Sequence, residues 1–119
     1  SHTYFVLVIQ NDTGNYLLEK RPDEGLLAQL WQFPMVKADE VDEKHLSAYI
    51  QEKFQVEVVE TNDLEPVKHV FSHLTWFLNV KYITVKGEMS VPGHMEYLTK
   101  EEIKQYPLPV SHQNIYKQL

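Results

Sequence analysis

Cysteine does not occur in this 119-residue sequence. Its absence excludes disulfide bonds, thiolate zinc sites, iron–sulfur clusters ligated by this chain and a cysteine nucleophile, and it is compatible with a reducing compartment. No apolar run approaches the roughly 20 residues that a membrane-spanning helix needs, and no signal-peptide pattern opens the sequence. Any chemistry of this chain must therefore come from other side chains.

Positive charge is also scarce. The sequence holds a single arginine, Arg21, and its formal net charge is −6 at pH 7. Domains that bind nucleic acid mainly through charge usually present a basic surface. A DNA-binding role would therefore draw most of its phosphate contacts from elsewhere, with Lys20, Arg21, Lys68 and Lys81 as the candidates within this chain. The alternative is that these four residues are ordinary surface charge.

The composition otherwise indicates one globular domain. Hydrophobic residues make up 43% of the sequence and charged residues 24%, which is ordinary for a folded protein, and the length suits a single core. Internal repeats and low-complexity linkers are absent. Because an apolar segment begins at Tyr4, we expect residues 1–119 to form a single domain of a longer protein, the alternative being a very compact protein.

Hydrophobic periodicity predicts a mixed fold. Strands are predicted at residues 4–9, 16–21, 31–33, 56–59, 67–71, 74–85 and 95–98. Residues 42–54 are predicted to form an amphipathic helix, because Leu46, Tyr49, Ile50 and Phe54 recur at helical spacing. This order of elements predicts an α+β or mixed α/β sandwich.

Polar residues mark where elements are expected to begin or turn. The acidic run at residues 39–42 is expected to open the central helix, since carboxylates satisfy free N–H groups there. Thr99 with Glu102 predicts a capping box, and Ser111 is expected to cap a final helix. Residues 62–63 (Asn-Asp) are predicted to form a turn.

The central helix resembles a damaged form of the Nudix signature: Gly, five residues, Glu, seven residues, then Arg-Glu-U-x-Glu-Glu-x-Gly-U, where U is apolar. In that family the glutamates hold divalent cations, which prefer several carboxylate oxygens. Aligning the apolar positions gives Ala48-Tyr49 for Arg-Glu, Ile50 and Val56 for U, Glu52-Lys53 for the acidic pair and Gln55 for Gly. Only Glu52 survives of these acids, and Lys53 beside it repels a cation. We therefore predict neither a metal site nor a catalytic residue, and interpret Glu52 and Lys53 as a solvated helix surface.

Further segments narrow the resemblance. They are Arg21-Pro22, Gly25-Leu26-Leu27-Ala28, Leu30-Trp31, Phe33-Pro34 and His69-Val70-Phe71-Ser72-His73. In this combination the sequence resembles, over nearly its whole length, the C-terminal domain of MutY-type A/G-specific adenine DNA glycosylases. The resemblance implies a Nudix-like (MutT-like) α-β-α sandwich with a mixed sheet and a degenerate Nudix helix.

The resemblance also implies a function. The parent enzymes are N-glycosyl hydrolases of base excision repair that remove adenine mispaired with 8-oxoguanine. Their N-terminal domain performs the chemistry and carries an iron–sulfur cluster, whereas this domain is non-catalytic, needs no cofactor and helps to recognise the oxidised guanine through Phe71, Ser72 and His73. The implied partners are double-stranded DNA with an 8-oxoguanine:adenine mispair and the N-terminal domain of the same chain, in the cytoplasm and nucleoid of a bacterium.

The chemistry of a serine suits this task. Guanine presents an acceptor at N7, whereas oxidation at C8 turns N7 into an N–H donor and adds an acceptor oxygen beside it. A hydroxyl both donates and accepts, so Ser72 can bond either new group. It can also rotate and donate to normal guanine, so we expect it to discriminate by only about 1–3 kcal/mol. Strong selectivity must then come from shape and from the partner domain.

Plainer interpretations of these residues stay open. Ser72 is equally explained as a turn residue, Phe71 as a core aromatic that aims Ser72, and His73 as a ligand of either a phosphate or a backbone carbonyl. Four further aromatic side chains either stack on bases or pack in the core, which is the default: Trp31, Trp76, Phe77 and Tyr82.

Two other functions compete with lesion recognition. The first is an active Nudix hydrolase of oxidised nucleoside triphosphates, which would use Glu40, Glu52 and Glu57 with magnesium. The second is a protein-interaction domain that docks another repair factor through its sheet or acidic surface.

Overall fold

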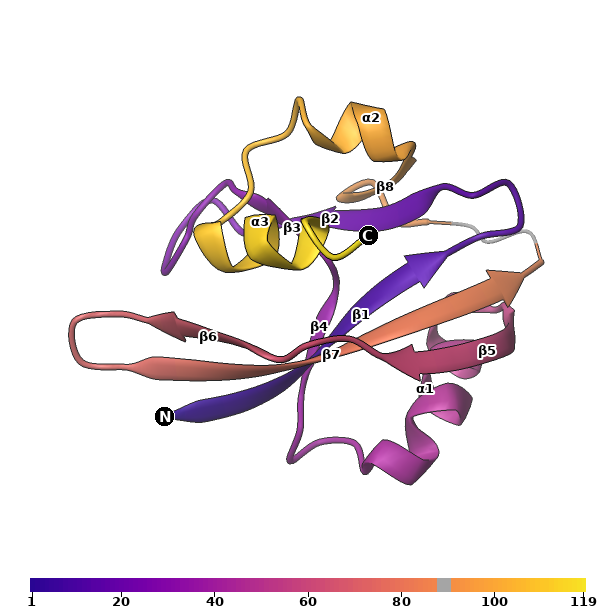
Figure 1. The fold of residues 1–119 in the computed structure, drawn as a ribbon, viewed down its shortest axis with the longest axis horizontal. Coiled ribbons are helices and arrows are strands. Elements are labelled where there is room, and N and C mark those ends of the chain that lie inside the picture. The colour runs from indigo at the N-terminus through magenta and orange to yellow at the C-terminus, as the bar shows by residue number, and fades with distance from the viewer. Residues whose placement is uncertain (88–90) are drawn as a thin grey trace.

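A mixed β-sheet separates two helical layers in the computed structural model, which describes residues 1–87 and 91–119. Figure 1 shows helix α1 on one side of the sheet and helices α2 and α3 on the other. This is the predicted α-β-α sandwich with a mixed sheet. Within the described residues no helix is long and apolar enough to cross a bilayer.

Two long parallel strands form the centre of the sheet. Strand β1 (His2–Gln10) pairs with β7 (Thr75–Lys86) over nine residues, from His2 opposite Trp76 to Gln10 opposite Thr84. All five residues at positions 5–9 are buried, as the continuous apolar run predicted for a strand covered on both faces. Alternate residues of these strands therefore face the two helical layers.

Shorter strands complete the sheet. Antiparallel neighbours of the central pair are β4 (Met35–Lys37) on β1, and β5 (Glu57–Asp63) and β6 (Val67–Val70) on β7. Strand β2 (Tyr16–Lys20) meets β1 at the hairpin and pairs with β3 (Trp31–Gln32) and β8 (Met95–Leu98). Strand β6 pairs with β7 alone, and β1 pairs with the same part of β7 on its other side. The β6–β7 hairpin, which we call the β6–β7 arm, projects with its loop past the start of β1 (Figure 1).

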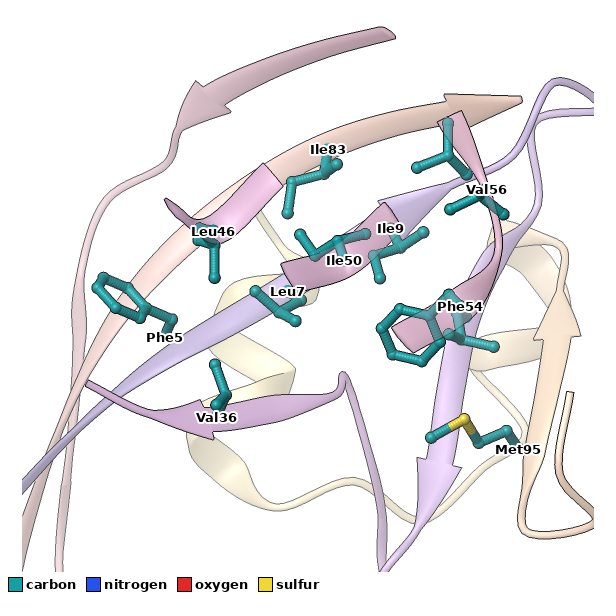
Figure 2. Close-up of a cluster of buried hydrophobic side chains, with 12 residues drawn as sticks. Phe5, Leu7, Ile9, Val36, Leu46, Ile50, Phe54, Val56, Ile83 and Met95 are labelled. Atoms are coloured by element: carbon teal, nitrogen blue, oxygen red, sulfur yellow. The ribbon is translucent and has the colours of Figure 1, made fainter. Parts of the chain in front are cut away.

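An apolar cluster holds α1 on its face of the sheet. Helix α1 (Leu46–Phe54) follows a short 3-10 helix at Glu43–His45 and buries Leu46, Ile50 and Phe54. Figure 2 shows these side chains gathered with those of the sheet, among them Phe5, Leu7, Ile9, Val36 and Ile83. The predicted apolar stripe is confirmed, although the α-helix begins four residues later than expected.

The opposite face is covered by the C-terminal helices α2 (Lys100–Ile103) and α3 (Val110–Tyr116). Thr99 and Glu102 form the predicted capping box: the Thr99 hydroxyl accepts from the Glu102 N–H, and the Glu102 carboxylate accepts from the Thr99 N–H. Buried residues of both helices, Ile103 and Ile115, join a second apolar cluster with Leu78 and Trp76 of β7 and with Phe33 of the β3–β4 connection.

Three local predictions were wrong. Residues 62–63 lie within β5 rather than in a turn, because β7 is long enough to pair with them. The acidic run 39–42 precedes the helix, and the Asp42 side chain makes no cap hydrogen bond. Ser111 lies inside α3, whose N-cap is Pro109. Its buried hydroxyl forms a hydrogen bond with the His69 ring of β6 instead of capping the helix.

Candidate nucleic-acid interface

The β6–β7 hairpin carries the tripeptide Phe71-Ser72-His73 at its tip. A hydrogen bond from the Phe71 N–H to the Leu74 carbonyl (2.7 Å) closes the loop directly after the last strand pair, Val70 opposite Thr75. The side chains of Ser72 and His73 are exposed, whereas Phe71 is half-buried. The loop is therefore a tight turn that presents two polar residues to solvent.

Aromatic contacts fix Phe71 beneath that turn. Its ring stacks on His69 with centroids 4.5 Å apart and planes 20° from parallel, and it meets the edge of Trp76 at 4.9 Å and 69°. The ring of Tyr4, on the adjacent strand β1, lies 5.0 Å from the Trp76 ring, measured between centroids. Phe71 thus packs as a supporting aromatic, which is the interpretation in which its packing directs Ser72.

Arg21 supports the same cluster from a neighbouring loop. Its guanidinium carbon lies 5.4 Å from the centre of the Trp76 ring, a cation–π distance. Two of its N–H groups donate internally, to the Leu26 carbonyl (3.1 Å) and to the Gln32 side chain (3.0 Å). The Gln32 amide in turn donates to Glu19 (3.0 Å). Arg21 therefore uses two of its five N–H donors inside the domain, and its role as a phosphate contact stays a prediction.

The loop between Arg21 and Leu30 is locally strained. Leu27 and Gln29 adopt positive φ angles of 56° and 65°, which non-glycine residues rarely do. Backbone bonds from Arg21 N to Leu30 O (2.8 Å) and from Gln29 N to Pro22 O (3.0 Å) hold this conformation. Such strain persists where the surrounding structure fixes it, and it concentrates at functional sites.

His69 links the hairpin to the last helix. Its Nδ1 lies 2.7 Å from the Ser111 hydroxyl of α3, and burial lowers its pKa below the usual value. The ring is therefore favoured in its neutral form, in which one ring nitrogen donates and the other accepts. The hydroxyl of Ser111 matches either role.

A second histidine is buried deeper in the same layer. His112 of α3 accepts a hydrogen bond at Nδ1 from the Phe33 N–H (3.1 Å) and stacks on the Phe33 ring. Burial, with smaller contributions from the charges of Arg21 and His69, lowers its pKa to about 3. An accepting Nδ1 requires the proton of the neutral ring to lie on Nε2.

Trp76 carries an unsatisfied donor at the centre of the cluster. Among the described residues its indole Nε1 is buried without a hydrogen-bond partner, which usually costs about 1–3 kcal/mol. The ring itself contacts Tyr4, His69, Phe71 and Arg21. We interpret the tryptophan as retained for its flat aromatic surface rather than for its N–H.

The other predicted residues separate into interior and surface. Tyr82 lies inside, with its hydroxyl bonded to Tyr16 and Gln10, and Trp31 packs edge-on against Tyr106. Core packing is thus confirmed for Trp76 and Tyr82 but wrong for Phe77, which is 45% exposed.

The ammonium of Lys81 is enclosed by Asp63 (2.6 Å) and Glu43 (3.0 Å), whereas Lys20 and Lys68 are exposed and stay predictions as phosphate contacts.

Sequence analysis did not identify the residues that join these motifs. Gln32, His112 and the true role of Ser111 were missed, since each acts through a partner far along the chain. Nothing in the sequence around Ser111 indicates that its hydroxyl bonds His69, which lies 42 residues earlier in the chain. The segments that carry the family resemblance did point to this region, because three of their residues, Arg21, Phe33 and His69, meet on the α3 side of the sheet.

The helix α1 lacks the arrangement of a metal site. Glu52 and Lys53 are exposed, and the Lys53 ammonium bonds the Tyr49 hydroxyl (3.1 Å). Glu40 and Glu52 line one shallow hollow, and Glu57 lines another. Within the described residues no group of three or more His, Asp or Glu is close enough to hold a metal ion. The three carboxylates of the hydrolase alternative are therefore not brought together.

One feature of the Nudix signature survives as backbone geometry. Gln55, which aligns with the signature glycine, ends α1 in the left-handed conformation with φ 55° and ψ 47°. Glycine is favoured at such a helix end because it has no Cβ. The chain thus has a left-handed residue at the position of the signature glycine, although glutamine stands there.

Comparison with known proteins places these features in a family. Residues 5–118 match the NUDIX domain family. The sequence is 31% identical to the adenine DNA glycosylase of Arabidopsis thaliana over 104 residues, which cover 76% of this chain and 16% of that protein. It is 32% identical to the human adenine DNA glycosylase over 93 residues, or 72% of this chain and 17% of that protein. The chain spans about a sixth of the length of these relatives.

Solved structures agree on the fold. The C-terminal domain of mouse MUTYH, in complex with human PCNA, superposes with a TM-score of 0.77 at 22% identity, covering 99% of this chain and 86% of that one. The MutT NUDIX hydrolase of Burkholderia pseudomallei also gives 0.77, at 21% identity, covering 99% and 97%. The fold alone therefore does not distinguish a hydrolase from a glycosylase domain. The resemblance seen in the motifs is confirmed: the chain belongs to the NUDIX domain family, and its sequence matches a region of the adenine DNA glycosylases.

Proposed function

We propose that this chain is the lesion-recognition domain of an adenine DNA glycosylase and that it helps to read 8-oxoguanine opposite adenine. The observation that carries the proposal is the exposed Ser72-His73 pair at the tip of a hairpin whose preceding residue, Phe71, is packed against two aromatic rings. A reader of a base edge must be accessible and must also be held in one orientation. This loop meets both requirements.

The proposed contact is a hydrogen bond from 8-oxoguanine to Ser72. The hydroxyl accepts from N7–H of the oxidised base or donates to its new C8 oxygen, and a correct base contact is worth about 1–3 kcal/mol. We assign His73 to the neighbouring phosphate or base, within the same exposed turn. The aromatic ring of Phe71 sets the direction from which both side chains approach.

The chemistry would belong to another domain of the parent protein. The described residues gather no set of carboxylates for hydrolysis, and the net charge of −6 opposes tight binding of DNA by this chain alone. In the proposed enzyme, a partner domain flips the adenine out of the helix and cleaves its glycosidic bond. Residues 1–119 would then complete a clamp around the mispair, with Lys20, Arg21 and Lys68 as its candidate phosphate contacts.

The test replaces Ser72 in the full-length glycosylase. Ser72→Ala should reduce the preference for 8-oxoguanine over guanine opposite adenine by about 5- to 100-fold, which corresponds to the loss of one base contact. Binding constants for both duplexes measure the preference, and the single-turnover rate at saturating enzyme should change less. Since Ser72 is exposed, the thermal stability should not change. An unaltered preference would refute the role of Ser72.

The hydrolase alternative needs its own experiment. The isolated domain is incubated with magnesium and either dGTP or 8-oxo-dGTP, and pyrophosphate release is followed. We expect no release, because Glu40, Glu52 and Glu57 do not share one site. Release that is abolished by Glu52→Gln would replace the recognition proposal by hydrolysis.

A protein-interaction role is favoured by one observation, namely that the similar mouse domain was solved in complex with human PCNA. A glycosylase deleted for residues 1–119 distinguishes this role from lesion recognition. If the deleted enzyme keeps its full preference for 8-oxoguanine, docking becomes the better explanation.

A further inference from the structure

Helix α3 runs beside the β6–β7 arm (Figure 1). Hydrogen bonds join the two segments at two places, one within α3 and β6 and one between the residues just after α3 and just before β6. Near the tip, the His69 ring of β6 bonds the Ser111 hydroxyl at 2.7 Å. Near the base, the Gln118 side chain accepts from the Glu65 N–H (2.8 Å) and donates to the Glu65 carbonyl (3.0 Å). The last helix therefore braces the arm from one side.

Strand β6 is the less supported strand of this arm. It lies at the edge of the sheet and pairs with β7 alone, whereas β7 is also paired with β1 on its other side. Val70 and Phe77 on the α1 side of the arm are exposed, at 64% and 45%, so α1 does not cover it. Contacts from the α3 side therefore add to the single row of strand hydrogen bonds that holds β6.

The hydrogen bond between His69 and Ser111 is connected to the loop through the contact of His69 with Phe71. His69 lies between Ser111 on one side and Phe71 on the other, since its ring bonds the first and stacks on the second at 4.5 Å. Ser111 is only 4% exposed and begins no helix, so its hydroxyl is not explained by capping. The Phe71 ring, one residue before Ser72, thus takes its position from a ring anchored to α3.

We propose that His69 and Ser111 are positioning residues for lesion recognition: together they hold Phe71 and so fix the approach of Ser72 to the oxidised base. This inference rests on the proposed function of the loop. Neither residue touches the DNA in this scheme. Their effect should therefore appear in the preference for the lesion, with little change in the rate of the glycosidic step.

The test is a double-mutant cycle in the full-length glycosylase. Ser111→Ala removes the hydroxyl, His69→Phe keeps a flat ring but removes the nitrogen, and the double variant removes both. Each single variant should lower the ratio of the dissociation constants for guanine:adenine and 8-oxoguanine:adenine duplexes about 2- to 10-fold, as for one hydrogen bond. The double variant should lose no more than either single variant, because both substitutions break the same bond.

Two control variants separate positioning from general stability. Ser47→Ala makes the same chemical change on the exposed surface of α1 and should change neither stability nor preference. Thr99→Ala breaks the capping box of α2, in the same layer as α3, and should lower the unfolding temperature without changing the preference. A spectroscopic readout completes the set: the 15N resonance of the His69 Nδ1 should shift in Ser111→Ala and stay in place in both controls.

Three results would overturn the inference. If Ser72→Ala lowers the preference but Ser111→Ala and His69→Phe do not, the loop reads the lesion without this brace. If the losses of the two single variants add in the double variant, they do not act through their shared bond. If Ser72→Ala itself has no effect, the lesion-reading function fails first and the positioning role fails with it.

Discussion

Each face of the sheet buries an apolar cluster, and the two faces differ in the polar contacts that accompany it. On the α1 face, Leu46, Ile50 and Phe54 pack on an apolar cluster of the strands. On the α3 face, buried polar side chains are paired over long sequence distances, among them His112 with Phe33 and His69 with Ser111. Apolar burial is non-directional, whereas each of these hydrogen bonds fixes an orientation.

The two faces therefore keep different features. The α1 face keeps its apolar stripe although the solvent side of the helix lacks most of the signature carboxylates. The α3 face adds polar contacts that reach the β6–β7 arm. In the proposed function, the contacts that orient the loop thus belong to the α3 layer.

The largest effect on stability is expected on the α1 face. Ile50 is fully buried in the apolar cluster, and Ile50→Ala should lower the free energy of unfolding by about 2–5 kcal/mol, because it removes apolar contacts and leaves a cavity. Urea denaturation measures the change. At a temperature where the variant is still folded, its preference for 8-oxoguanine should match that of the wild type.

The matched control on the same helix is Glu52→Ala. Glu52 is exposed, and surface substitutions usually change stability by less than about 0.5 kcal/mol. A folded Ile50→Ala protein that has lost its lesion preference would contradict the division of labour between the two faces.

A pH effect is expected from the α3 face. The pKa of His112 is about 3 in the folded protein and near its usual 6.5 in the unfolded chain, so the unfolded chain binds the extra proton between these values. Stability should therefore fall as the pH drops below 6.5, by up to about 1.4 kcal/mol per pH unit. Denaturation curves between pH 7.5 and 5 avoid most carboxylate titration and measure this slope.

His112→Asn provides the control for the pH effect. The amide oxygen of asparagine can accept from the Phe33 N–H in place of Nδ1 but does not titrate. The slope should become shallower, with a remainder from His69, whose pKa burial also lowers. An unchanged slope would show that the acid sensitivity does not come from His112.

The smallest expected effect concerns the end of α1. Gln55 has φ 55°, so Gln55→Gly relieves a left-handed conformation that costs a residue with a Cβ about 1 kcal/mol, at the loss of the exposed bond from the Gln55 amide to the Glu52 carbonyl. We expect a gain of about 0.5 kcal/mol or less in the free energy of unfolding. A clear loss would mean that the side-chain bond outweighs the backbone strain.

Local sequence patterns predicted much of the fold. The apolar run at residues 5–9, the stripe of Leu46 and Ile50 and the capping box at Thr99 were all found as expected, since each depends on near neighbours. Residues 62–63 were misassigned because turn-forming residues entered a strand once β7 offered them partners. The hairpin that carries Ser72 and His73 also follows from two adjacent strand patterns, at residues 67–71 and 74–85.

The sequence by itself determined two properties of this protein. Its motif segments identified the family, and Lys53 showed that the acidic pair is lost, because a metal site needs carboxylates at fixed helical positions. Only the tertiary structure decided how the Phe71-Ser72-His73 loop is held. Ser111 reaches His69 across 42 residues of chain, and Arg21 reaches Trp76 from another loop. Such contacts depend on which strands and helices meet in the folded chain, and no local pattern of residues encodes that.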